Sequence, residues 1–170
     1  MNRRSSIFTL IIIGIILIYF FIDPFSNKLS DPEKITIYYE KEKYDLPSDN
    51  PIVPDLVSLV EEALDDVKGT YKGIRETPAQ YTDSVQTMVF KVNPGTIVRV
   101  SPSDTGSAKL QPELVVLPLQ GADYEQSQVI TVGDENGLRM YRTSRATLEE
   151  IKELIDGYLS EQGVHVKNGK

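Results

Sequence analysis

A run of sixteen residues without a charged side chain, from Ile7 to Ile22, constrains this 170-residue chain more than any other feature. Sixteen helical residues at about 1.5 Å each cover about 24 Å, a little short of a hydrocarbon core of roughly 30 Å. Arg3 and Arg4 precede the run and can snorkel to the membrane interface. Because the run has no polar face, it predicts a transmembrane helix rather than a core helix of a water-soluble domain.

A cleaved signal peptide is the alternative, since it too has a basic start and a short apolar run. The small-x-small cleavage signature is missing, because bulky residues occupy its place at 19–22. We therefore expect residues 1–22 to form a cytoplasmic tail and an uncleaved signal-anchor. The two arginines and the terminal amine outnumber the basic residues soon after the run, Lys28 and Lys34. This difference favours a cytoplasmic N-terminus and an extracytoplasmic C-terminal domain in the cell membrane.

The rest of the chain has the make-up of one folded, acidic domain. Subtracting Arg3 and Arg4 from the 18 basic residues leaves 16 against 25 acidic residues in 23–170, a net charge of −9. This charge argues against nucleic acid as a partner. The organisation we predict is a linker at 23–32, one α+β domain at 33–163 and a tail at 164–170.

Short alternating or β-rich runs predict most of the secondary structure. The predicted strands are 35–40, 44–46, 87–92, 96–100, 114–119, 129–132 and 138–143. We expect residues 101–111 to form an exposed, mobile loop, and Pro118 predicts that its strand ends at a sheet edge.

Two stretches have apolar residues at helical spacing. Residues from Val53 to Val67 predict one helix that stops at Gly69. Thr147 with Glu150 three positions later forms a capping-box pattern, which predicts the start of a last helix. The predicted fold is therefore α+β: an N-terminal transmembrane helix, then one domain with a mainly antiparallel sheet and two amphipathic helices on one face.

The chain has few residues of the types that usually serve as nucleophiles or metal ligands. The chain has no Cys and one His, His165, which lies in the tail. This inventory weighs against a cysteine nucleophile and a zinc site, and phosphate-loop, dinucleotide and serine-hydrolase motifs are missing as well. We expect no metal and no cofactor, and the sequence weighs against an enzyme without excluding one. The acidic cluster Glu61, Glu62, Asp65 and Asp66 is interpreted as a solvated helix face.

One local constellation suggests ligand binding. Arg139, Arg142 and Arg145 approach the N-terminus of the last predicted helix. Guanidinium groups beside free helix N–H groups can hold a phosphate or a carboxylate. The alternative is that Glu149 and Glu150 already pair with these arginines.

An interaction protein is favoured by three features together: the anchor, the acidic domain and the small number of catalytic residue types and motifs. We expect an extracytoplasmic binding domain, accessory or regulatory to another cell-envelope protein, with a protein partner in or near the membrane. Two alternatives stay open: a carboxylate-dependent cell-envelope hydrolase, which needs only two acids, and a small-anion binding domain.

Overall fold

The computed structural model describes residues 27–29, 32–71, 86–120, 128–134 and 137–166. The predicted membrane span at 7–22 and most of the predicted linker lie outside these residues. Within the described part of the chain, no helix has the length and apolar character needed to cross a membrane.

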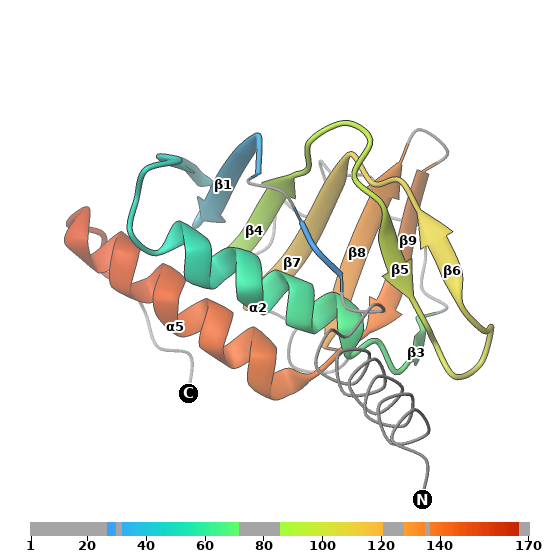
Figure 1. Ribbon diagram of the computed structural model, residues 1–170. Coiled ribbons are helices and arrows are strands. Elements are labelled where there is room, and N and C mark those ends of the chain that lie inside the picture. The colour runs from blue at the N-terminus through green and yellow to red at the C-terminus, as the bar shows by residue number, and fades with distance from the viewer. Residues whose placement is uncertain (1–26, 30–31, 72–85, 121–127, 135–136, 167–170) are drawn as a thin grey trace, which may run out of the picture.

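The described strands form two antiparallel sheets. Their bounds are β1 (Lys34–Tyr39), β2 (Glu42–Leu46), β3 (Gly69–Thr70), β4 (Gln86–Lys91), β5 (Val98–Val100), β6 (Ala108–Leu110), β7 (Leu114–Gln120), β8 (Val129–Asp134) and β9 (Gly137–Arg142). Seven of these described strands form one sheet in the order β2-β1-β4-β7-β8-β9-β3, and β5 pairs with β6 in a separate sheet (Figure 1). The predicted α+β fold with a mainly antiparallel sheet is confirmed.

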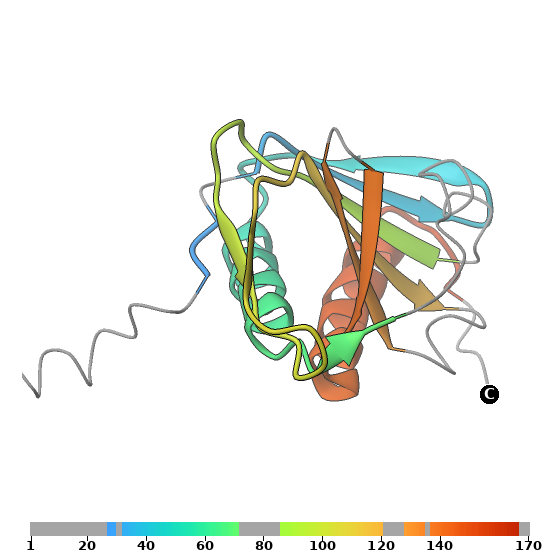
Figure 2. The ribbon, with the colours of Figure 1, turned by 90° about the vertical axis from the view of Figure 1, so that its right-hand side faces the viewer.

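Helices α2 (Val53–Asp65) and α5 (Arg145–Glu161) cover one face of the large sheet, and the β5–β6 pair lies beside them (Figures 1 and 2). The apolar spacing that predicts each helix also gives it one buried face, shown by Leu56 and Leu64 in α2 and by Ile151 in α5. These side chains meet Ile37 and Phe90 of the sheet in the main hydrophobic core. Both amphipathic helices are therefore confirmed.

The opposite face of the sheet is also buried at β7, β8 and β9. Val116, Val129, Leu138 and Met140 form a second hydrophobic cluster there. Strands that are buried on both faces explain the nearly continuous apolar sequence of β7.

The loop prediction for 101–111 is wrong in part, because these residues contain β6, whose Leu110 is buried in the main core. Pro118 lies in β7, the middle strand of the large sheet. In the described residues the β7–β8 register ends at Val116, so at Pro118 the strand pairs with β4 alone. The end of β7 is therefore open on its β8 side, which suits a residue that lacks an N–H.

The last helix begins earlier than predicted and ends just before Gly163. It starts at Arg145, and Thr147 does not cap it, because its hydroxyl donates to Oε1 of Glu62 at 3.0 Å. At the other end Gly163 has a φ of +80°, a left-handed conformation that suits glycine. The Gly163 N–H donates to the Ser160 carbonyl at 3.0 Å, which terminates the helix.

Candidate functional site

The structure does not gather the three predicted arginines into one site. Arg139 and Arg142 are three positions apart in β9, so their side chains point to opposite faces of the sheet. Arg142 lies over the Tyr71 ring, 5.9 Å from its centroid. Arg145 donates from Nε to Glu149 Oε1 at 2.8 Å, so the pairing alternative holds for this residue. The alternation of the predicted strand 138–143 already implies this separation.

Arg139 instead lines a cleft of about 830 Å³ that lies where β4 ends and β7 begins. The connection between β4 and β5 and the connection between β6 and β7 form its other walls. Figure 1 shows both connections at the top of the view, at the ends of the strands away from α2. Ile97, in the first connection, is 51% exposed, and no other large hydrophobic side chain of the described residues is classed as exposed.

The cleft has a positive charge excess in an acidic protein. Lys91 Nζ and Glu33 Oε1 are 2.9 Å apart, so these two charges neutralise each other. Lys109, Arg139 and Glu113 also line the cleft, which leaves two cations against one carboxylate. An apolar side chain beside two cations can hold a segment that carries an apolar group next to a carboxylate or phosphate.

The hydrolase hypothesis requires two acids across one cleft. Glu33 and Glu113 both line this cleft, but Glu33 is held in its ion pair with Lys91. Both acids are exposed to water, whereas a general acid requires a carboxyl group in an apolar environment. The geometry of the cleft therefore does not favour glycosidase chemistry.

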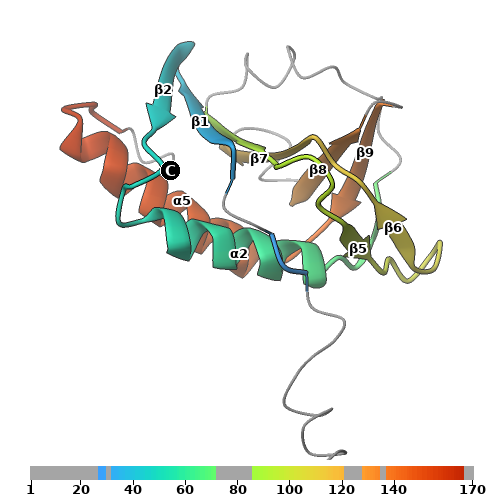
Figure 3. The same ribbon diagram turned by 45° about the horizontal axis from the view of Figure 1, so that its top comes forward.

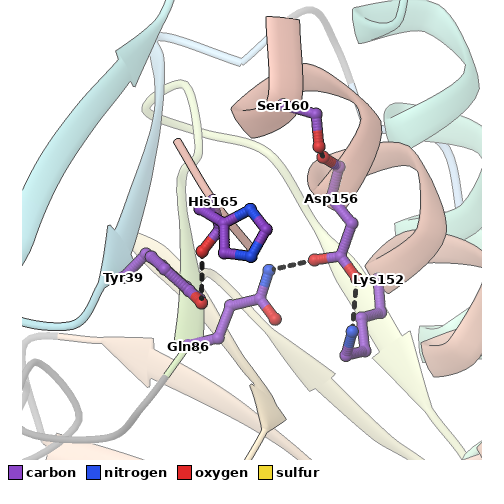
Figure 4. Close-up of polar contacts among 6 residues, drawn as sticks. All are labelled: Tyr39, Gln86, Lys152, Asp156, Ser160 and His165. Carbon is purple, nitrogen blue, oxygen red and sulfur yellow. Dashed lines mark hydrogen bonds and ion pairs between the residues drawn. The ribbon is translucent and has the colours of Figure 1, made fainter. Parts of the chain in front are cut away.

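A partly buried polar cluster lies under the C-terminal half of α5 (Figure 4). Gln86 is fully buried and donates from Nε2 to Asp156 Oδ1 at 2.8 Å. Asp156 also pairs with Lys152, one turn earlier in the same helix. The Tyr39 hydroxyl donates to the backbone carbonyl of His165 at 3.5 Å, so the single histidine contributes its backbone at this contact. The Gln86–Asp156 bond joins α5 to β4, and the Tyr39–His165 bond joins the segment after α5 to β1.

Two buried acceptors lie near this cluster. Oε1 of Gln86 and Oε1 of Gln120 accept no hydrogen bond from the residues that the structure describes. The two residues are partners in the β4–β7 ladder. Such buried acceptors are uncommon in folded proteins, and a water molecule is their usual donor.

A third constellation, the Asn27 clasp, consists of Asn27, Asp65 of α2 and Arg99 of β5. The backbone N–H and Nδ2 of Asn27 donate to Asp65 Oδ1 at 2.9 and 2.7 Å. Nδ2 also donates to the Arg99 carbonyl at 2.7 Å, and the Arg99 N–H donates back to Oδ1 at 2.6 Å. Asn27 is only 4% exposed, so these bonds form largely out of water.

The clasp involves residues of both the predicted linker and the acidic cluster, so neither is only exposed surface. Residues 27–29 belong to the predicted linker, yet Leu29 is buried in the main core and its N–H donates to Glu61 Oε1 at 2.5 Å. The acidic cluster is not merely solvated surface, because Glu61 and Asp65 hold this segment and Glu62 holds Thr147. The local sequence around Asn27 does not predict this role, because its partners lie 38 and 72 residues away in the chain.

No group of three or more Asp, Glu, His or Cys in the described residues is arranged to hold a metal ion. Comparisons of the chain with protein-family models, with curated proteins and with solved structures give no match.

Proposed function

We propose that this protein is a single-pass, membrane-anchored binding domain, accessory or regulatory to another cell-envelope protein. The observation that carries the proposal is the cleft, which places exposed Ile97 beside Lys109 and Arg139. Binding surfaces concentrate their energy in a few residues that become fully desolvated, and arginine is common among them.

The partner that suits this cleft is a protein segment with an apolar side chain next to an acidic one. Burying an isoleucine completely gains about 1.5–3 kcal/mol. Since Ile97 is 51% exposed, a partner that covers it gains about half of that, roughly 1 kcal/mol. The two cations add selectivity for an acidic segment.

The location is part of the proposal. Residues 7–22 act as the signal-anchor, with the N-terminus in the cytoplasm and the domain outside. The Asn27 clasp supports an anchored role, because the chain that follows the apolar run joins the folded domain within a few residues.

Photo-cross-linking in native membranes tests the proposal. A photoreactive amino acid at Gln111, which lines the cleft, is compared with the same probe at exposed Ser160 on α5. We expect one protein adduct from position 111, none from position 160, and loss of the adduct in an Ile97→Asp variant. Identical adducts from both positions, or an adduct that survives Ile97→Asp, would refute the cleft as the binding site.

The positive excess of the cleft also favours a second candidate, a small anion. In that case millimolar phosphate or a simple carboxylate raises the melting temperature of the protein. Arg139→Gln removes this shift and Arg142→Gln, on the other face of β9, retains it. If neither ligand shifts the wild-type protein, the anion-binding candidate fails.

A further inference from the structure

We infer that the Asn27 clasp makes one end of the domain face the membrane that holds the chain's own anchor. This end, the clasp end, comprises the clasp, the C-terminal end of α2 and the start of α5. The inference rests on the proposed function, since it requires residues 7–22 to span the bilayer. It adds an orientation: the clasp end lies nearest the bilayer, and the opposite end of the domain lies farther from it.

The chain between the apolar run and the clasp is too short for a free tether. Only residues 23–26 separate Ile22 from Asn27. Five Cα–Cα steps reach at most about 18 Å when fully extended. The headgroup layer takes up about 5–7 Å of that distance on each side of the bilayer. The clasp therefore lies close to the headgroups in every conformation of the connecting residues.

The clasp also fixes the point at which the chain enters the domain, because two different elements hold Asn27. Its bonds to Asp65 attach it to α2, and its bonds to Arg99 attach it to β5. Leu29, two residues later, is buried in the core. The point of entry therefore stays at the clasp end, and the length of the connecting residues limits how far this end lies from the bilayer.

The orientation gives the two ends of α5 different distances from the membrane. The start of α5 lies beside the C-terminal end of α2, because the Thr143 hydroxyl donates to the Ala63 carbonyl at 2.5 Å and Thr147 bonds to Glu62. Seventeen helical residues then carry the chain about 25 Å away, to Glu161. Figures 1 and 3 show residues 27–29 at the same end as the start of α5.

The charges at the clasp end bear on the kind of membrane surface that suits it. Asp66 and Glu149 form ion pairs with Lys68 and Arg145. Glu61, Glu62, Asp65 and Asp104 accept hydrogen bonds from uncharged groups, and such bonds do not neutralise a carboxylate. Because anionic headgroups repel carboxylates, zwitterionic lipid suits this end of the domain better than anionic lipid.

Fluorescence quenching in vesicles tests the orientation, and the Cys-free chain allows single labels. The full chain is reconstituted into phosphatidylcholine vesicles that contain a lipid spin-labelled at its headgroup. A fluorophore is attached at Lys68→Cys, near the clasp, or at Glu161→Cys, at the far end of α5. We expect several-fold stronger quenching at position 68 than at position 161. Equal quenching at the two positions would overturn the inference.

Two further variants separate the clasp from the fold. A Gly/Ser insertion of about ten residues between 26 and 27 adds an r.m.s. span of about 17 Å and leaves every clasp bond intact, so it should lower the quenching at position 68 towards that at 161. Asn27→Ala should do the same, while Asn50→Ala, which removes a side-chain bond at the start of α2, should not. Unchanged quenching in the insertion variant would also overturn the inference.

The same preparation tests the proposed anchor separately. A chain without a membrane span does not float with the vesicles, and that result would refute the proposed function. A chain that floats but shows equal quenching refutes only the orientation.

Discussion

Replacing Asn27 by alanine tests how firmly the clasp holds the start of the domain. The change removes three side-chain hydrogen bonds: Nδ2 to Asp65, Nδ2 to the Arg99 carbonyl, and the Arg99 N–H to Oδ1. A neutral hydrogen bond contributes about 1 kcal/mol net, and one to a carboxylate contributes about 1.5–3 kcal/mol. Their sum, about 3.5–5 kcal/mol, is an upper limit, because Asp65 is exposed and water replaces part of its loss. We expect a decrease in the free energy of unfolding of about 2–3 kcal/mol.

The assay is urea unfolding of the full chain in a mild detergent, followed by far-ultraviolet circular dichroism. The urea dependence of the unfolding free energy should stay unchanged, so that the midpoint alone moves. A double-mutant cycle with Asp65→Ala isolates the pair and should give a coupling of about 1–2 kcal/mol. Asn50→Ala, which removes one bond to the Ile52 N–H, is the control and should cost about 1 kcal/mol.

Either of two results would contradict the stabilising role of the clasp. One is a loss below about 0.5 kcal/mol for Asn27→Ala, which is within the range of an ordinary surface substitution. The other is additivity of the Asn27 and Asp65 variants, because residues in direct contact should couple.

Three further predictions concern the stability of the fold. A Cβ at Gly133 would lie 2.7 Å from a leucine side chain, so Gly133→Ala should destabilise the protein by about 1 kcal/mol. A Cβ at Gly157 would enter open space, so Gly157→Ala should stabilise the protein by about 0.4–1 kcal/mol. Thermal unfolding measures both effects. The Lys34 ammonium beside Asp45 lowers the pKa of that carboxyl group. Asp45 therefore stabilises the fold above its unfolded-state pKa, and this stabilisation is lost as the pH falls through its folded-state pKa. Between neutral pH and about pH 3, the urea midpoint of Asp45→Asn should therefore fall less than that of the wild type. Gln86→Met removes a buried acceptor that has no donor among the described residues, and it also removes the bond to Asp156. These two effects oppose each other, so its unfolding free energy should stay within about 1 kcal/mol of the wild type.

Each of these predictions has a contradicting result. The glycine pair fails if both variants shift the melting temperature in the same direction. The pH prediction fails if the wild type and Asp45→Asn lose stability in parallel. A loss above about 2 kcal/mol for Gln86→Met would show that its oxygen accepts a hydrogen bond from a bound donor such as water.

Local pattern was sufficient for the elements of this fold. The spacing of apolar residues three and four apart predicts α2 and α5, because a helix returns to the same face at that interval. Alternation around a turn predicts the β1–β2 and β8–β9 hairpins in the same way. The apolar run at 7–22 predicts a membrane span for an equally local reason, the absence of any polar face, and this span stays a prediction because it lies outside the described residues.

Tertiary structure decided which residues meet. Pro118 lies in a central strand, and in the described residues β7 pairs with β8 only as far as Val116, an end that the sequence does not mark. The cleft at Ile97 forms from two connections and a third strand, and the three arginines separate because strand alternation and an ion pair assign each a different environment. The Asn27 clasp joins residues 38 and 72 positions apart. A local pattern fixes which face of an element is apolar, but a polar contact between distant residues forms only after those faces have packed.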